Sequence, residues 1–284
     1  MTELQTRILE IFKAVSSICE DEGLQYFAIG GTCLGAVRHH GFIPWDDDVD
    51  IAMPIDDFLR FLDIAGSRLP AHLSLIGSHN RRYFNQMFFK VIDNRTTAIE
   101  VLDVPYKEAY KGIWIDIMPI CSFPSQKALE RFIPQDTFLW TGNIFLRFGV
   151  PKKSTLIKDI TCNCYRFPAL VRDFRFYSRL WLKKLRKNGF HRDGVTGYVW
   201  SPSHLEAFQI PAVWFADTVL MDFEDTQMRC PAGWDGFLKA MFGNYMDFPP
   251  PEQRNSGHML AKVDLEHPYK DYQNGLLKIN LNGQ

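Results

Sequence analysis

Aspartates gather near the N-terminus, at Asp46, Asp47, Asp48 and Asp50. Asp48 and Asp50 are separated by one residue, and in an extended strand such side chains point to the same face. Two carboxylates side by side repel each other unless a cation or a proton lies between them, and oxygen ligands select hard ions such as Mg²⁺ or Mn²⁺. We therefore expect Asp48 and Asp50 to bind a divalent metal ion; a solvated acidic turn is the alternative.

A further carboxylate stands in an apolar run, at Asp116 between Ile115 and Ile117. A charge in the middle of a buried strand is costly unless it is paired or binds metal. We expect Asp116 to complete the metal site, or to accept a proton from an attacking hydroxyl. A salt bridge to a buried Arg or Lys is the alternative interpretation.

A glycine pair, Gly30 and Gly31, ends an apolar run shortly before the aspartates. Thr32 is then a plausible N-cap for a short helix, whose first N–H groups suit a phosphate. Arg38 could bind two phosphate oxygens at once, and Lys90 could bind phosphate through its single positive charge, although each could also be an ordinary surface charge. We expect these five residues to bind a phosphorylated donor.

Periodicity predicts the elements that must position these residues. Helices are expected over residues 4–19, 54–65 and 235–242, and Pro54 would be the first residue of the second helix. Strands are expected over residues 26–29, 49–52, 73–76, 87–92, 97–102 and 112–119. The tail after Lys262 is polar, and we expect it to pack loosely. The expected fold class is α/β (α+β), with a mixed sheet covered by helices.

The composition is that of a globular protein: 284 residues, 46% hydrophobic, 23% charged, with a net charge of −1. The start lacks the features of a signal peptide, and no apolar run is long enough for a transmembrane helix. We therefore expect a cytoplasmic protein with reduced cysteines. The cysteines have no zinc-like spacing, so a zinc site is disfavoured.

The charge is uneven, because residues 152–192 contain twelve Lys or Arg against two acids, with aromatic residues at helical spacing. One interpretation is a pair of helices that cover the sheet, with their charges in water. A second is attachment to an anionic membrane surface, which would place the protein peripherally at the inner face of the membrane. Nucleic-acid binding is not expected, because no recognition motif accompanies the charge.

The long run from Gly30 to Ile51 closely resembles the signature of the LicD family, which includes phosphocholine transferases of bacterial surface polysaccharides and is similar to fukutin and fukutin-related protein. The resemblance continues in ranges 90–93, 114–119, 223–224, 242–246 and 249–252 and at His258. Where the family pattern has a glycine after Glu224, this chain has Asp225.

This resemblance implies a nucleotidyltransferase fold. Together with the change of character after Cys121, it leads us to expect a nucleotidyltransferase-like core over residues 1–120, a basic helical insert over 121–196, and a C-terminal part over 197–284 that completes the same catalytic domain. It also implies transfer of a phospho-alcohol from a CDP-linked donor such as CDP-choline to a sugar hydroxyl. The acceptor would be a cell-surface glycan (teichoic acid, lipopolysaccharide or capsule) or its lipid-linked precursor, with release of CMP.

In this scheme Asp48, Asp50 and Asp116 are the catalytic and metal-binding residues, and Gly30, Gly31 and Thr32 receive phosphate. Three rivals remain: a nucleotidyltransferase, a glycosyltransferase that uses a DxD motif and a nucleotide sugar, and a non-catalytic membrane-associated partner in glycan assembly. The sequence leaves open the transferred alcohol, the acceptor, the oligomeric state, and the roles of Asp46, Asp47, His39 and His40.

Overall fold

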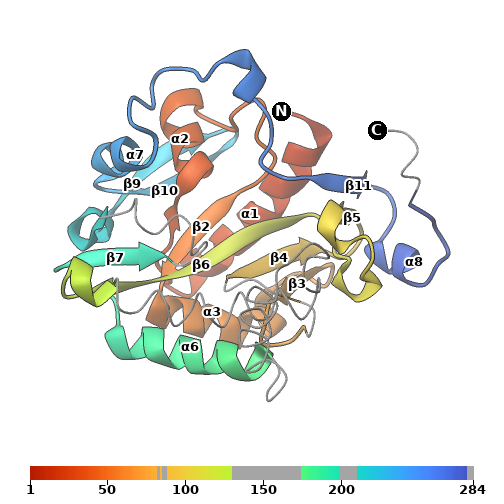
Figure 1. Cartoon of the computed structure of the whole chain (residues 1–284), viewed down its shortest axis with the longest axis horizontal. Helices are drawn as coiled ribbons and strands as arrows, with labels where there is room; N and C mark the ends of the chain where they lie inside the picture. The colour runs from red at the N-terminus through yellow and green to blue at the C-terminus, as the bar shows by residue number, and fades with distance from the viewer. Residues whose placement is uncertain (82–83, 85–87, 130–173, 199–209, 280–284) are drawn as a thin grey trace, which may run out of the picture.

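The computed structural model describes residues 1–81, 84, 88–129, 174–198 and 210–279, which form an α/β structure around a mixed sheet (Figure 1). The main path of the sheet runs in the order β1-β2-β6-β4-β3, and β7 and β8 extend it beyond β6. Its strands are β1 (Phe27–Ala28), β2 (Asp50–Pro54), β3 (Leu73–Ile76), β4 (Phe89–Asp93), β6 (Trp114–Phe123), β7 (Val195–Tyr198) and β8 (Ile210–Pro211). The β2–β6 pair is parallel and the other pairs are antiparallel, so the expected mixed sheet is confirmed.

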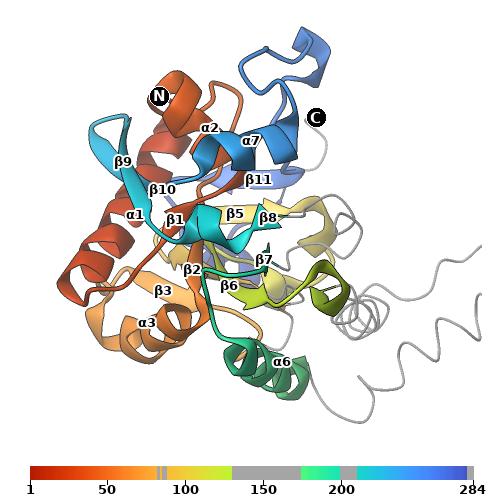
Figure 2. The same cartoon turned by 90° about the vertical axis from the view of Figure 1, so that its left-hand side faces the viewer.

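Helices cover both sides of this sheet (Figures 1 and 2). In both views α3 and α6 lie on one side, and α2 and α7 lie on the opposite side with the β9–β10 hairpin. The helices are α1 (Glu3–Asp21), α2 (Gly30–His39), α3 (Ile55–Arg68), α6 (Phe174–Asn188), α7 (Trp234–Phe242) and α8 (Tyr269–Gln273). All ten residues of β6 are buried, which explains why its sequence is a nearly continuous apolar run.

Two small antiparallel pairs complete the fold. The strands β9 (Thr218–Phe223) and β10 (Thr226–Pro231) form a hairpin, and β5 (Thr97–Glu100) pairs with β11 (Leu260–Asp264). Short 3₁₀ turns connect the strands and helices: η1 (Val101–Asp103), η2 (Lys107–Ala109), η4 (Ala212–Phe215) and η5 (Pro251–Gln253). Among the described helices, none combines the length and apolar character needed to cross a bilayer.

The first helix shows how the sequence pattern sets the packing. In α1, residues such as Ile8, Phe12 and Val15 recur at helical spacing and are fully buried. Thr2 and Gln5 form a capping box at its start, and Gly23, at φ 62°, follows its end. The helix is therefore fixed at both ends as well as along its apolar face.

Three local predictions are wrong. Thr32 is not an N-cap, because α2 already begins at Gly30, and its hydroxyl accepts a hydrogen bond from the backbone N of Asp50 at 2.8 Å instead. Pro54 is not the first residue of α3; it ends β2 and lies at the N-cap position. The tail does not pack loosely, because β11 continues through Asp264 and α8 buries two tyrosines, Tyr269 and Tyr272.

Residues 152–173 of the basic segment, like 199–209 of the predicted C-terminal part, lie outside the described residues. The described remainder contains α6, where Trp181 and Leu185 are buried against the core and bases such as Lys183 and Lys187 are exposed. The helix contacts β6 and α3, so its apolar side covers the sheet. This packing agrees with the first interpretation of the segment for residues 174–188.

Candidate active site

The sheet register brings three charged residues into one row. Asp50 of β2 pairs with Asp116 of β6, and Asp116 pairs with Lys90 of β4 on its other side. Residues that pair across neighbouring strands point to the same face of a sheet. The two carboxylates and the ammonium group, far apart in the sequence, therefore share one face at the centre of the sheet.

Lys90 and Asp116 form a buried ion pair. Lys90 Nζ donates to Asp116 Oδ1 at 2.6 Å, and the side chains are only 1% and 5% exposed. The ammonium also lies 4.3 Å from the ring centroid of Trp114 and 5.1 Å from that of Phe88. Burial raises the pKa of the Asp116 carboxyl, and Lys90 opposes that rise. Asp116 thus has the buried cationic partner that the alternative interpretation required.

The loop before β2 carries the other carboxylates, and two distant segments hold it. The amide of Gln5 in α1 donates to the carbonyl of Asp46 at 2.9 Å. His258, just before β11, places Nδ1 3.1 Å from Asp47 Oδ1 and Nε2 3.8 Å from Asp48 Oδ2. The loop is therefore fixed between the N-terminal helix and the C-terminal part of the chain.

Negative charge is crowded in this loop. Burial, followed by the neighbouring Asp48, raises the pKa of Asp46 to about 8. Burial, with Asp48 and then Asp116 nearby, also raises the pKa of Asp50 well above its usual range. These shifts express the free-energy cost of several carboxylates that share one partly buried place.

The start of α2 lies directly over these carboxylates. Gly30 has φ 54°, and a Cβ there would lie 3.7 Å from Asp50 Oδ2. A Cβ at Gly31 would lie 2.6 Å from Asp46 Oδ2, closer than real contacts allow. The residue at the N-cap position, Ile29, makes no side-chain cap. The glycine pair therefore lets a helix N-terminus approach the aspartates closely, with its first N–H groups uncapped by a side chain.

The far end of α2 is fixed by the turn of the β9–β10 hairpin. Glu224, at φ 54°, accepts a hydrogen bond at Oε1 from the backbone N of Phe42, and its own N donates to the carbonyl of His40. A Cβ at Gly41 would meet the Glu224 carboxylate, so a larger residue there would displace the side chain that accepts from Phe42. His40 takes the left-handed conformation that ends the helix, which gives it a local structural role.

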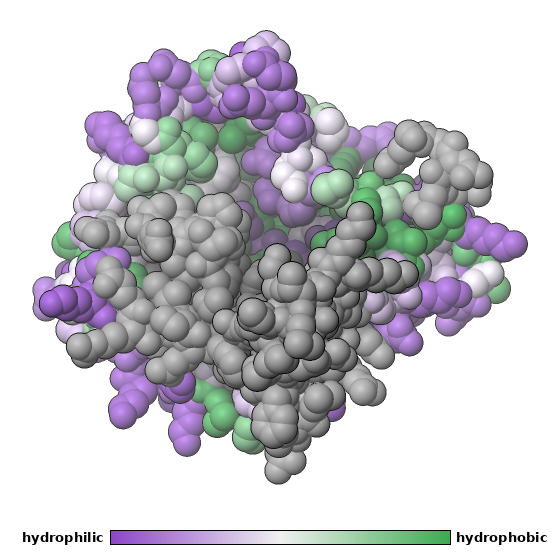
Figure 3. All heavy atoms as spheres, viewed as in Figure 1, coloured by the Kyte–Doolittle hydropathy of each residue, from purple (hydrophilic) through white to green (hydrophobic). Residues whose placement is uncertain are grey.

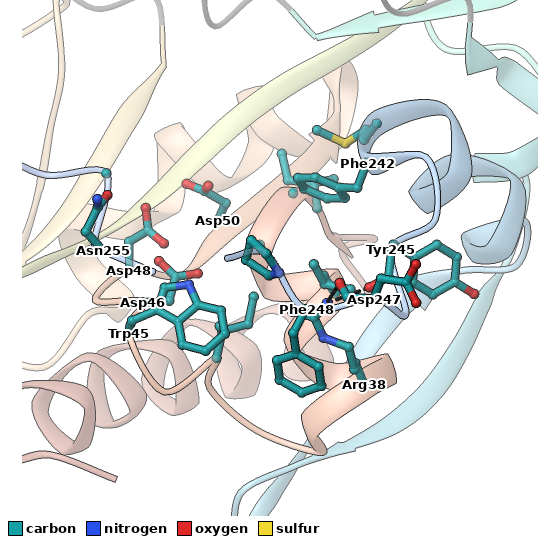
Figure 4. A pocket seen from close by; sticks show the side chains of 18 of the residues that line it. Arg38, Trp45, Asp46, Asp48, Asp50, Phe242, Tyr245, Asp247, Phe248 and Asn255 are labelled. Carbon is teal, nitrogen blue, oxygen red and sulfur yellow. Dashed lines mark hydrogen bonds between the residues drawn. The ribbon is translucent and has the colours of Figure 1, made fainter. Parts of the chain in front are cut away.

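A cavity of about 760 Å³ opens beside the aspartates. Figure 3 shows a hollow on this face of the molecule, with both hydrophilic and hydrophobic residues around it. In Figure 4, Asp46, Asp48 and Asp50 lie on one side of the pocket, and Arg38 lies with the 245–248 loop on the other. The glycine pair and His258 also line it, whereas Asp116 and Lys90 are not among its described lining residues. The ion pair therefore lies beneath the pocket floor.

Arg38 reaches this pocket but already has partners. Its Nη1 donates to the carbonyls of Tyr245 at 2.5 Å and Asp247 at 3.1 Å, and its guanidinium lies 4.7 Å from the ring centroid of Phe248. Partial burial lowers the pKa of Arg38. Of the eight predicted site residues, seven thus lie at the carboxylate face, Lys90 among them as the partner of Asp116, and Arg38 lies across the pocket with protein partners of its own.

The carboxylate oxygens of Asp46, Asp48 and Asp50 are suitable ligands for a hard divalent cation, although they do not surround one common point. Within the described residues, no group of three or more His, Cys, Asp or Glu side chains is arranged to hold a metal ion. Asp46, Asp48 and Asp50 nevertheless line one pocket, and their crowding is what a cation relieves. The residues therefore fit a metal of the Mg²⁺ class by chemistry and charge.

Several residues at the site could not be found from local spacing. Gln5, Phe248 and Arg254 form contacts at the site or the pocket, and none of them belongs to a motif that the sequence marks. His258 entered the sequence argument only through the resemblance. Its contact with Asp47 joins residues from opposite ends of the chain, which no periodicity signals.

Comparisons with known proteins find similarity in the same part of the chain. Residues 23–130 match the family model described as LicD/FKTN/FKRP, nucleotidyltransferase domain. Lipopolysaccharide cholinephosphotransferase LicD of Haemophilus influenzae is 26% identical over 272 residues, which cover 91% of this chain and 96% of that protein.

Two further relatives match shorter stretches. Ribitol 5-phosphate transferase FKRP of Homo sapiens is 26% identical over 129 residues, 44% of this chain and 26% of that protein. Uncharacterized protein RP689 of Rickettsia prowazekii is 35% identical over 123 residues, 41% of this chain and 40% of that protein. The chain therefore spans about a quarter of the human relative and nearly the full length of the Haemophilus one.

Proposed function

We propose that this chain, whose residues 23–130 match the LicD/FKTN/FKRP nucleotidyltransferase model, is a LicD-type phosphotransferase that moves a phospho-alcohol from a CDP-linked donor to a sugar hydroxyl. Phosphocholine is the first candidate group, and CMP would be the released product. The acceptor would be a cell-surface glycan or its lipid-linked precursor. The observation that carries the proposal is the face shared by Asp50 and Asp116 beneath an uncapped helix start at Gly30.

In this proposal Asp48 and Asp50 hold a Mg²⁺ or Mn²⁺ ion, with Asp116 below them. Bound metal would neutralise charge on the donor's phosphate oxygens, which is the main requirement of phosphoryl transfer. Gly30 and Gly31, with the backbone N of Thr32, receive the phosphates at the start of α2. The Thr32 hydroxyl has a different task, since it fixes the backbone N of Asp50.

The remaining residues divide by their present partners. Asp116 lies in a buried ion pair with Lys90. To act as a proton acceptor, the Asp116 carboxylate must be ionised, and the Lys90 ammonium compensates that negative charge in the buried site. The phosphate contacts predicted for Arg38 and Lys90 stay predictions, and both side chains are already held by protein groups. Association with an anionic membrane through 152–192 also stays a proposal, supported by exposed bases such as Lys183 and Lys187 on α6.

The test of the function is a donor screen. Thermal shift and CMP release are measured with CDP-choline, CDP-ethanolamine, CDP-ribitol and CDP-glycerol, with and without Mg²⁺. One of these donors is expected to raise the melting temperature only with Mg²⁺ and to yield CMP when acceptor glycan is added. If UDP- or GDP-sugars alone bind and react, the glycosyltransferase interpretation replaces this one.

A further inference from the structure

The segment of residues 244–254, which follows α7 and includes η5, forms the wall of the pocket opposite the aspartates. Arg38 reaches it from the last turn of α2. One nitrogen, Nη1, donates to two carbonyls of this wall, at Tyr245 and Asp247, while the guanidinium lies over Phe248 (Figure 4). Arg38 therefore joins the helix that begins at the glycine pair to the opposite wall.

A second arginine holds the same wall from its other end. Arg254 Nε donates to the carbonyl of Pro249 at 2.9 Å. Its guanidinium lies 5.3 Å from the ring centroid of Trp45 and 5.6 Å from that of Phe248, and the two rings are 6.2 Å apart. Trp45 directly precedes Asp46, so this stack connects the wall to the carboxylate loop.

We infer that Arg38 is a positioning residue, which with Arg254 holds the 244–254 wall in place over the donor pocket. The inference deepens the proposed function and rests on it for the identity of the donor. Arg38 directs Nη1 to two neutral backbone carbonyls, Nε to His39 Nδ1 at 3.4 Å and its plane to the ring of Phe248, so its present contacts are those of a residue that holds protein segments together. The partial burial of its side chain agrees with this role.

If Arg38 positions the wall, its loss should affect donor binding and the transfer reaction differently. The wall supplies Asn244, Asp247, Phe248 and Pro249 to the pocket, whereas the reacting groups lie on the opposite side. Displacing the wall should therefore weaken donor binding and leave the reaction of the bound donor nearly unchanged. Lysine keeps the charge of Arg38 but has neither the planar fork nor the stacking face.

The first experiment measures the wall directly, without any ligand. Hydrogen exchange is followed by mass spectrometry in the wild type, Arg38→Lys and Arg254→Lys. Both variants are expected to exchange the amides of residues 244–254 roughly 10-fold faster or more, with other described segments unchanged. Unchanged exchange of this segment in Arg38→Lys would overturn the inference, whatever the enzyme's donor proves to be.

The second experiment is kinetic and uses the full chain. Both single variants are expected to raise the donor KM about 10-fold with kcat within about twofold, and the double variant to resemble the singles, because both arginines hold one wall. A lower kcat in Arg38→Lys that Arg254→Lys does not reproduce would instead make Arg38 a ligand of the reacting phosphate. Arg60→Lys, on the exposed side of α3, is the matched control.

The two experiments also separate the two proposals. If the wild type releases no CMP from any CDP-alcohol, the proposed function fails, while the exchange measurement still decides the role of Arg38. If the wild type is active and the variants match it in KM and in exchange, the function stands and the positioning role is wrong.

Discussion

Asp50 and Asp116 are register partners in the adjacent parallel strands β2 and β6, so their carboxylates share one face of the sheet. The pairing is direct: the backbone N of Asp116 donates to the carbonyl of Val49, and Val49 itself is fully buried. This register makes the two carboxylates part of one electrostatic unit. It also places Lys90, the next residue in the row, where it compensates the deeper carboxylate.

Removing one partner of the buried pair should chiefly damage the fold. Asp116→Ala leaves the Lys90 ammonium buried without its carboxylate, which we expect to cost about 3–5 kcal/mol of unfolding free energy. Urea denaturation followed by circular dichroism measures this cost. Lys90→Met with Asp116→Leu, which replaces both charges, should recover part of the lost stability, and a double variant less stable than Asp116→Ala would contradict the account.

Substitution of Asp48 should affect the transfer reaction without affecting the stability of the fold. It is part of the carboxylate loop and lines the pocket, and its side chain is 19% exposed. We expect Asp48→Asn to reduce transfer at least about 1000-fold, because the proposed function has this carboxylate hold the metal, with the melting temperature of the free protein nearly unchanged. Asp56→Asn, on the exposed surface of α3, is the control. CMP release by Asp48→Asn at the wild-type rate would remove Asp48 from the mechanism.

The hydroxyl of Thr32 should matter for stability more than its position in α2 suggests. Thr32→Val keeps the shape but leaves the backbone N of Asp50 without its acceptor in a buried place, so we expect a loss of about 1–3 kcal/mol. Thr32→Ser retains the hydroxyl and should lose less. Equal stability of the Val and Ser variants in urea would show that the hydrogen bond contributes nothing.

Acid stability should depend on a second buried charge cluster near β5. Lys111 Nζ lies 2.5 Å from Glu100 and 2.9 Å from Asp103. Burial alone would raise the pKa of Glu100, but Lys111 lowers it to about 2. Because the folded pKa lies below the unfolded value of about 4.3, this group stabilises the protein fully above about pH 5 and loses that contribution as pH falls toward 2.

The matching variant is Glu100→Gln. Its unfolding free energy should be lower than that of the wild type at neutral pH by on the order of 2 kcal/mol, and the difference should shrink between about pH 5 and pH 2. Denaturation curves at several pH values measure the difference. A gap that stays constant down to pH 2 would contradict the depressed pKa.

Much of the site could be predicted because its residues belong to patterns of neighbouring residues in the sequence. The apolar run of β6 with Asp116 at its third position, the aspartate cluster, and the glycine pair each mark themselves in the sequence. The mixed sheet followed from the same pattern, since alternation and burial depend on residues that are neighbours in the chain. The family resemblance then connected these pieces before any geometry was available.

The rest depended on contacts between distant segments. Thr32 is a residue type that often caps helices, but α2 begins before it, at Gly30. Its hydroxyl instead accepts a hydrogen bond from the backbone N of Asp50, and the sequence alone does not show that these two residues are neighbours. The C-terminal tail is polar, yet β11 pairs with β5, α8 buries Tyr269 and Tyr272, and Tyr272 donates to Asp264. Lys90 as the partner of Asp116 is a product of strand order, which the sequence left open.

The central claim is that the transferred group is a phospho-alcohol. The most direct measurement is mass spectrometry of a defined acceptor glycan after incubation with the wild-type chain, Mg²⁺ and the donor selected by the screen, with CMP quantified in the same sample. The account predicts that the acceptor gains the mass of the phospho-alcohol and that one CMP appears per acceptor modified. An acceptor that gains the nucleotide or a sugar, with no stoichiometric CMP, would contradict it.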